Sequence, residues 1–313
     1  MPVGLITHPA CLGHAPPRGH PESPERLEAV LLALGAPEFA GLLRLEAPEA
    51  PDAAIRRAHE GELVDRVKGE FALRARETGF AQIDPDTFMS PLSLDAALRA
   101  AGAVVLAVDE IHAGRLTRAF CAVRPPGHHA GHARAMGFCL FNNVAIGALH
   151  ARAAHGYRRV AVVDFDVHHG NGTQDIFEGD ADAFYASSHQ YPFYPGTGDA
   201  REHGISGNVV NVPLRAGSGR TEFRNAYETT ILPALARFGP EFIFISAGFD
   251  GHRADPLADL RLDEEDFAWV TSAIAEIANS QCAGRIVSVL EGGYDLDALA
   301  RSAAAHVRSL MEA

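Results

Sequence analysis

Short apolar runs alternate along this chain with longer segments in which apolar residues recur at the three- and four-residue spacing of a helix. The short runs predict strands over residues 3–7, 119–123, 159–164, 183–188, 241–246 and 285–290. The periodic segments predict helices over 52–76 with a break near His59, over 92–112, 142–155, 221–238 and 263–279, and from about residues 24, 172 and 295. This alternation predicts an α/β fold with a central, mainly parallel sheet and helices on both faces.

Stretches rich in His, Pro, Gly and other polar residues separate these elements and are predicted as loops, over 11–24, 81–91, 124–137 and 189–219. The chain has 313 residues, of which 47% are hydrophobic, enough for a large core. It shows no linker-like composition, charge block or fixed-period repeat, so we expect a single domain over residues 1–313.

Charge and cysteine content exclude several classes of protein. The 40 acidic and 27 basic residues give a net charge of −13, which repels a phosphate backbone, so we expect no nucleic-acid partner. The start of the chain lacks the features of a signal peptide, and no segment approaches the ~20 apolar residues that cross a bilayer. The cysteines have no spacing typical of disulfides or a sulfur-ligated zinc, and they stand at 11, 121, 139 and 282. We therefore expect a soluble cytoplasmic protein with no membrane partner.

Polar clusters follow five of the predicted strands, each at the point where the strand ends. They cover residues 124–129, 164–171, 187–189, 246–250 and 291–294. The carboxyl ends of parallel strands line a common crevice, so five separate segments can build one site there.

The segment after the apolar run 160–163 predicts a metal site. Side chains of an extended segment alternate in direction, so Asp164, Asp166 and His168 project to one side. Asp250, after the next apolar strand, can complete a three-ligand site with Asp166 and His168 that leaves a position open for water and substrate. The alternative is that these residues only cap helices and form turns.

Two further segments carry residues suited to acid–base and oxyanion chemistry. His128 and His129 are adjacent in a Pro-Gly loop, and paired imidazoles beside a metal suit general base and general acid work. Tyr294 follows Gly292 and Gly293, whose small size lets a phenol approach a reacting centre. Taken alone, such histidines are often solvated loop residues, and such a tyrosine is often a packing residue.

Several long motifs together resemble the zinc-dependent histone deacetylase and acetylpolyamine amidohydrolase family, in particular its class II branch. The motifs are Pro-Pro-Gly-His-His at 125–129, Met-Gly-Phe-Cys-Leu-Phe-Asn-Asn at 136–143, Asp-Phe-Asp-Val-His-His-Gly-Asn-Gly-Thr-Gln at 164–174, Tyr-Pro-Gly-Thr-Gly at 194–198, Ser-Ala-Gly-Phe-Asp at 246–250 and Glu-Gly-Gly-Tyr at 291–294. The resemblance runs from about residue 3 to the end of the chain. It implies an arginase-like α/β fold with an eight-stranded parallel sheet, and one deacetylase catalytic domain.

The resemblance also implies roles for single residues. Asp166, His168 and Asp250 would bind a catalytic Zn²⁺, in agreement with the spacing argument. His129 would activate the attacking water and then protonate the leaving amine, with His128 as its electrostatic partner. Tyr294 would donate a hydrogen bond to the developing oxyanion.

Two residues of the 164–174 motif would orient these histidines, Asp164 for His128 and Asn171 for His129. Other branches of the family have Asp at the position of Asn171, so His129 should have a lower proton affinity here.

The family also binds potassium close to the catalytic strand. Matched by position, that ion would be held by oxygens of Asp164, Asp166, His168, Ser187 and Ser188. Adjacent serines at a strand end are otherwise ordinary turn residues.

The substrate positions are less well defined by the resemblance. Gly137, Phe138 and Tyr194 match the walls of a narrow acyl-lysine channel, with Tyr194 standing where many relatives have Phe. Gly292, two residues before Tyr294, is a further candidate for substrate binding. Leu257 falls at the rim, where a carboxylate would select a cationic polyamine. Asp84 or Asp86 is the candidate rim carboxylate that holds the substrate backbone, and a Pro-flanked turn is the equal alternative.

Three functions remain open from the sequence. The first is hydrolysis of acyl-lysine in proteins or peptides, the second is hydrolysis of small acetylated amines such as acetylpolyamines, and the third is acyl-lysine binding with little turnover. Intact His128, His129 and Tyr294 argue against the third, because a binding protein needs neither a proton shuttle nor an oxyanion donor. Oligomerisation is compatible with the sequence, and iron or cobalt could use the same ligands as zinc.

Overall fold

Eight parallel strands form the central sheet of the computed structural model, which describes residues 2–313. Their order across the sheet is β2-β1-β5-β10-β9-β6-β7-β8. The strands are β1 (Val3–Thr7), β2 (Leu43–Glu46), β5 (Arg118–Cys121), β6 (Val160–Asp164), β7 (Ala183–Gln190), β8 (Val209–Leu214), β9 (Phe242–Ala247) and β10 (Ile286–Leu290). Every pairing in this sheet is parallel, which confirms the predicted α/β class.

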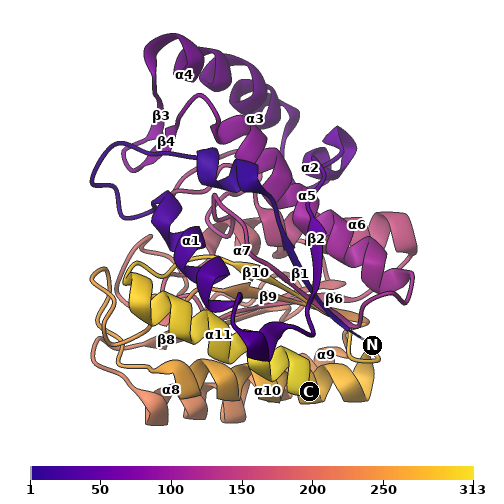
Figure 1. Cartoon of the computed structure of the whole chain (residues 1–313). Coiled ribbons are helices and arrows are strands. Elements are labelled where there is room, and N and C mark those ends of the chain that lie inside the picture. The colour runs from indigo at the N-terminus through magenta and orange to yellow at the C-terminus, as the bar shows by residue number, and fades with distance from the viewer. Residues whose placement is uncertain (1) are drawn as a thin grey trace.

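Helices cover both faces of the sheet (Figure 1). One face carries α5 (Ser93–His112), α6 (Asn143–His155) and α7 (Asn171–Phe177). The other carries α1 (Pro24–Ala33), α8 (Arg220–Ala226), the π-helical turn η4 (Tyr227–Ile231), α9 (Leu232–Phe238), α10 (Glu264–Gln281) and α11 (Leu296–Glu312). The interior strands β5, β6, β9 and β10 are buried along their whole length, which is why their sequences read as continuous apolar runs.

A group of short elements packs beyond α5 and α6, at the top of Figure 1. It consists of α2 (Asp52–Ala58), α3 (Gly61–Asp65), the π-helical turn η3 (Arg66–Phe71), α4 (Ala72–Thr78) and the hairpin of β3 (Ala81–Asp84) and β4 (Thr87–Met89). The 3₁₀ turns η1 (Pro9–Gly13) and η2 (Pro37–Phe39) precede and follow α1. The predicted break near His59 is present, since α2 ends at Ala58 and His59 is extended.

The sequence prediction missed four strands. β2 has no apolar run because it is an edge strand whose residues are mostly exposed. β8, inside the stretch predicted as irregular, is the opposite edge and is only half-buried. The predicted loop over 81–91 contains β3 and β4, whose three- and four-residue lengths are too short for a clear alternation of apolar and polar positions.

The parallel register brings the carboxyl ends of the interior strands to one level. Asp164 at the end of β6 pairs with Ser187 of β7 on one side and with Ser246 of β9 on the other. The loops that leave these strands therefore begin side by side. Within residues 2–313, no helix is both long enough and apolar enough to cross a membrane.

Candidate active site

Three predicted metal ligands converge beyond the ends of β6 and β9. His168 Nδ1 lies 3.1 Å from Asp166 Oδ1 and 3.0 Å from Asp250 Oδ2. One donor atom from each residue falls within 4.8 Å of the other two. Both carboxylates are fully buried and held by backbone donors, since Gly292 N–H donates to Asp166 Oδ2 and Val167 N–H donates to Asp250 Oδ1.

Two glycines make room for the carboxylates. A Cβ at Gly292 would lie 2.1 Å from Asp250 Oδ2, and a Cβ at Gly248 would lie 1.9 Å from Asp166 Oδ2. Any larger residue at either position would displace a predicted ligand. Glycine at 292, two residues before Tyr294, is therefore required by the candidate metal site.

The donor set suits a divalent cation such as Zn²⁺. Two carboxylates and one imidazole are hard and borderline ligands, and three protein ligands leave a coordination position open. Burial, together with the negative charge of Asp166, raises the pKa of Asp250 to about 7 in the absence of a cation. A divalent ion between the two carboxylates would relieve this repulsion, so the site fits the metal that the sequence predicts.

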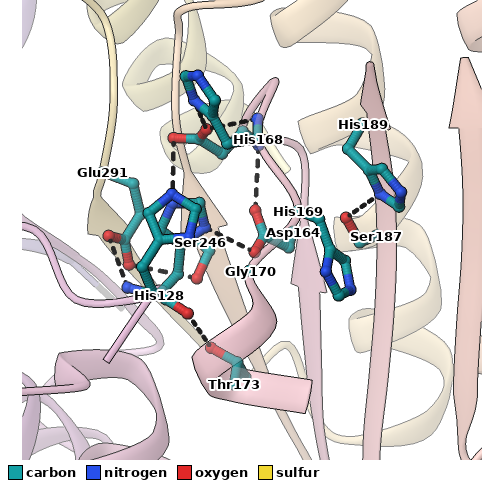
Figure 2. A network of polar contacts seen from close by, with 12 residues as sticks. His128, Asp164, His168, His169, Gly170, Thr173, Ser187, His189, Ser246 and Glu291 are labelled. Carbon is teal, nitrogen blue, oxygen red and sulfur yellow. Dashed lines mark hydrogen bonds and ion pairs between the residues drawn. The ribbon is translucent and has the colours of Figure 1, made fainter. Parts of the chain in front are cut away.

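His128 lies in a network of buried acidic groups (Figure 2). Its Nδ1 lies 3.0 Å from Asp164 Oδ2, and its Nε2 lies 3.8 Å from Asp166 Oδ2. Burial alone would lower the pKa of His128, but the carboxylates of Asp166 and Asp164 outweigh burial and raise it to about 10. We therefore describe His128 as an imidazolium that donates to Asp164.

Glu291 fixes the backbone of the His128 loop. Its Oε2 accepts hydrogen bonds from Gly127 N–H and His128 N–H, at 2.7 and 3.2 Å, and its Oε1 accepts one from Ser246 Oγ. Figure 2 shows Glu291 and Ser246 next to His128. The carboxylate thus ties the ends of β10 and β9 to the loop that carries the two histidines.

His129 has a different environment from its neighbour. Its Nδ1–H donates to Asn171 Oδ1 at 2.8 Å, and its ring centroid lies 4.0 Å from that of His128. Burial, followed by the positive charge of His128 and, in the absence of a metal ion, that of His168, lowers the pKa of His129 well below its usual range. His129 is therefore neutral, with Nε2 free to accept a proton. The pair consists of one charged and one neutral imidazole, as acid–base work requires.

Tyr294 faces the same cavity from the end of β10. Asp255 holds its backbone, accepting a hydrogen bond from Tyr294 N–H at 2.6 Å. The guanidinium of Arg26 lies 4.8 Å from the centroid of the Tyr294 ring. Burial raises the pKa of Tyr294 well above its usual range, so the phenol keeps its proton and can donate it in a hydrogen bond.

A cavity of about 220 Å³ opens onto these groups. The predicted residues that line it are His128, His129, Gly137, Phe138, His168, Tyr194, Leu257, Gly292 and Tyr294. Asp86, one of the two candidate rim carboxylates, also lines it, together with Pro126 and Phe193. Phe193 stacks on His168 with an interplanar angle of 20°, and Tyr194 meets His129 edge-on. The walls are therefore aromatic near the candidate metal site.

Gly137 and Phe138 form a tight turn that shapes one wall. Both have positive φ, 59° and 68°, and a Cβ at Gly137 would lie 2.5 Å from the His129 ring. Phe138 N–H donates to Thr87 Oγ1, which connects this turn to the β3–β4 hairpin. Glycine at 137 thus lets the wall approach the candidate base closely.

Of the two candidate rim carboxylates, Asp86 lines the cavity and Asp84 does not. Asp84 is half-buried in β3, and its Oδ2 accepts a hydrogen bond from Arg134 at 2.6 Å. Of the two alternatives, the structure therefore favours Asp86, which stands in the connection between β3 and β4, as the candidate rim carboxylate.

The residues predicted to bind potassium lie together, and their side chains make hydrogen bonds with other protein groups. Ser187 Oγ lies 2.9 Å from His189 Nδ1, and Ser188 Oγ donates to Tyr227 at 3.3 Å. Asp164 Oδ2 accepts from both His128 and Tyr185, and Asp164 Oδ1 accepts from Asp166 N–H.

A buried ion-pair network behind the site escaped the sequence prediction. Glu22, Arg26 and Arg124 are fully buried. Arg124 donates to both oxygens of Glu22, and Arg26 donates to Glu22 and to the backbone carbonyls of Glu291 and Gly293. The sequence predicted only the start of a helix here. The signal for a buried ion pair was that Glu22 and Arg26 stand where a Pro-rich loop meets a helix face that is otherwise apolar. The network anchors the segment that carries Tyr294.

The histone deacetylase domain family matches residues 20–310. Type-2 histone deacetylase 2 of Dictyostelium discoideum is 38% identical over 98% of this chain, which spans 20% of that protein. The histone deacetylase-like amidohydrolase of Pseudomonas aeruginosa is 38% identical over 94% of this chain and 76% of its own length. The crystal structure of the HDA15 HD domain matches with a TM-score of 0.92 and 36% identity, over 99% of this chain and 88% of that one.

Proposed function

Because this chain belongs to the histone deacetylase family, we propose that it is a zinc-dependent amidohydrolase that removes acetyl or other acyl groups from lysine side chains. One observation carries the proposal. A buried Asp166–His168–Asp250 cluster lies at an aromatic-walled cavity that also presents a neutral His129 and the phenol of Tyr294. These residues would together supply the metal ligands, the proton acceptor and the oxyanion donor that amide hydrolysis requires.

The cluster of Asp166, His168 and Asp250 would hold Zn²⁺. When bound there, Zn²⁺ supplies a Lewis acid that acidifies water and polarises the amide carbonyl. Gly248 and Gly292 keep the space around the carboxylates clear.

His129 takes the proton of the attacking water on Nε2, because its Nδ1 is engaged by Asn171. The same nitrogen then returns the proton to the leaving amine. His128 remains an imidazolium and offsets negative charge that develops on the tetrahedral carbon's oxygens, and Tyr294 donates a hydrogen bond to the oxyanion. Asp164 holds His128 in the orientation for this work.

The cavity favours an aliphatic chain with an amide at its end. Its walls include Phe138, Phe193 and Tyr194, and Leu257 adds an apolar contact on the same lining. Asp86 is the single carboxylate outside the catalytic cluster in this lining, and it is suited to accept hydrogen bonds from a peptide backbone. The partner is therefore an acylated lysine in a peptide or protein.

Hydrolysis of small acetylated amines is the alternative, and Asp86 is the observation that favours it. A carboxylate at a cavity wall also attracts an ammonium group. A comparison of kcat/KM for acetyl-lysine peptides and for acetylated polyamines, with one zinc-loaded preparation, distinguishes the two. We expect the peptides to be preferred, and a large preference for the polyamines would overturn the assignment.

Zinc dependence is tested by removal and return of the metal. Treatment with a chelator should abolish hydrolysis, and return of Zn²⁺ should restore it. Metal content should be measured in the same samples, because Fe²⁺ or Co²⁺ in the same ligands would also give activity. Full hydrolysis by a protein shown to be free of metal would contradict the proposal.

We further propose, from family resemblance, that potassium binds near Asp164, Ser187 and Ser188. The register supports this assignment, because Asp164 of β6 pairs with Ser187 of β7, next to Ser188. A rise in thermal stability with KCl, and not with equal ionic strength of a larger monovalent cation, tests it.

A further inference from the structure

A second cluster of candidate metal ligands lies on α5 and α6, which pack side by side (Figure 1). His150 Nε2 lies 2.8 Å and His155 Nε2 lies 2.6 Å from the same oxygen of Asp109, Oδ1. The three donor atoms fall within 4.8 Å of one another. Asp109 belongs to α5 and the two histidines to α6, so the cluster joins the helices.

This cluster is remote from the catalytic site. α6 begins beside the catalytic loop, where Asn143 Nδ2 donates to the carbonyl of Pro125. The helix then runs for 13 residues to His155, roughly 18 Å away at 1.5 Å per residue. The cluster therefore lies toward the amino-terminal edge of the sheet, opposite the Asp166–His168–Asp250 site.

The hydrogen-bonded arrangement of these three side chains also fits a metal site. The rings of His150 and His155 are nearly perpendicular, at 89°, yet each directs Nε2 at one point. Two imidazoles and one carboxylate form a donor set that binds Zn²⁺ and neighbouring divalent transition metals, with bonds of about 2.0–2.2 Å. Small movements of donor atoms that already lie together would reach those lengths.

The surrounding residues support the two histidines as ligands. His112 stacks on His155 with centroids 4.0 Å apart and an angle of 21°, and His112 Nδ1 lies 3.2 Å from the Tyr157 hydroxyl. These contacts fix the ring plane of His155, as supporting residues do around metal ligands. His150 is only 9% exposed, and its Nε2 is the ring nitrogen that faces Asp109.

The electrostatics also favour a cation at this position. Among residues 2–313, Asp109 forms ion pairs with His150 and His155 and with no Arg or Lys. His155 is the last residue of α6, and the carbonyl end of a helix attracts positive charge. The side chains of Asp109 and His155 are 42% and 18% exposed, so an ion can enter from solvent.

We propose that Asp109, His150 and His155 bind a divalent transition-metal ion such as Zn²⁺, Co²⁺ or Ni²⁺, at a structural site that links α5 to α6. Three protein ligands leave the remaining coordination to water. The site is separate from the catalytic cluster and predicts a second equivalent of metal per chain.

Equilibrium dialysis with Co²⁺ on metal-stripped protein tests the proposal. We expect two equivalents of bound Co²⁺ per chain for the wild type and one for Asp166→Ala. The double variant His150→Gln/His155→Gln should also bind one equivalent and should retain zinc-dependent hydrolysis. His203→Gln is the matched control, because it removes an exposed imidazole outside the cluster, and the variant should still bind two equivalents. In the Asp166→Ala background, Zn²⁺ should raise the melting temperature, and the added His155→Gln change should remove that rise.

Asp109→Asn provides an independent variant if the double histidine variant does not fold. The amide keeps the size of the side chain and one oxygen but removes the charge, so the second equivalent should be lost or weakened by at least about 10-fold. One equivalent in the wild type, or two equivalents that persist in both His155→Gln and Asp109→Asn, would overturn the proposal.

Discussion

His129 Nδ1 lies 2.8 Å from the amide oxygen of Asn171, whereas His128 Nδ1 lies 3.0 Å from a carboxylate oxygen of Asp164. Adjacent histidines thus have a neutral and an anionic partner. The difference agrees with the opposite shifts of their pKa values, lowered for His129 and raised to about 10 for His128. It divides the work between a proton acceptor and a fixed positive charge.

Asn171→Asp should move the acidic limb of the kcat/KM profile to higher pH. A carboxylate beside Nδ1 stabilises the protonated ring, so the neutral base persists only at higher pH, by roughly one unit. Asn225→Asp, which adds the same charge on the exposed surface of α8, should leave the profile unchanged. An acidic limb that does not move in Asn171→Asp would argue against His129 as the base.

Tyr294→Phe should lower kcat by about 10²–10³-fold while KM changes little, because the phenol acts on charge that appears only in the transition state. Tyr194→Phe is a matched control in the same cavity, since the Tyr194 hydroxyl is buried without a hydrogen-bond partner and should contribute little. Steady-state kinetics on one acetyl-lysine peptide would compare them. Equal loss in the two variants would contradict the oxyanion role of Tyr294.

Gly292→Ala should lower metal occupancy as well as activity. The added Cβ would lie 2.1 Å from Asp250 Oδ2 and 2.7 Å from Asp166 Oδ2, so at least one ligand must move. Zinc per chain, measured after dialysis in the His150→Gln/His155→Gln background, should fall well below one. Gly179→Ala is the control, because no atom lies within 4 Å of a Cβ there, and its zinc content should equal that of the wild type.

Leu257→Glu should shift selectivity toward cationic substrates. Leu257 lines the cavity, and a carboxylate in its place attracts an ammonium group, which should raise kcat/KM for an acetylated polyamine by about 10-fold. The gain should shrink as salt is added, because the site is open to solvent. Leu257→Gln keeps the size without the charge and should show no gain. An equal gain in Leu257→Gln would show that the shape of the side chain, and not its charge, changes the selectivity.

Much of the candidate site could be predicted because it depends on local order along the chain. Asp164, Asp166 and His168 alternate at the end of one strand, and the parallel register then brings Ser246 and the loop to Asp250 alongside. Both facts follow from the pattern of apolar runs. The interior strands were predicted for the same reason.

The residues that could not be predicted depend on geometry between distant segments. The choice between Asp84 and Asp86 rests on a register shift in the β3–β4 pairing between Gln82 and Asp84, and a change of one residue reverses the direction of a side chain. Arg26 meets the carbonyl of Gly293 across 267 positions of sequence. Asp109 and His150 lie 41 positions apart on two helices. No pattern within a short stretch of sequence predicts these contacts.

His59 should make the fold sensitive to acid. It is 3% exposed; its Nδ1–H donates to the carbonyl of Gly131, and its Nε2 accepts from Asn142 N–H. Burial outweighs the hydrogen bond to Gly131 and lowers the pKa of His59 to about 4. In the unfolded chain the pKa is about 6.5, so below that pH the unfolded state binds a proton that the native state does not. Above pH ~6.5 the titration of His59 therefore does not lower the free energy of unfolding. As the pH falls from there toward about 4, the free energy of unfolding decreases by about 1.4 kcal/mol per pH unit.

The measurement is the free energy of unfolding in urea at pH 7 and pH 5, for the wild type and for His59→Gln. Gln cannot titrate, so its variant should lose about 2 kcal/mol less than the wild type between these two pH values, whatever its stability at pH 7. The comparison of slopes separates titration from lost packing, because a packing defect lowers stability equally at both pH values. Equal losses in the two proteins would show that His59 is protonated in the native state, and would contradict the buried neutral ring that links Gly131 to Asn142.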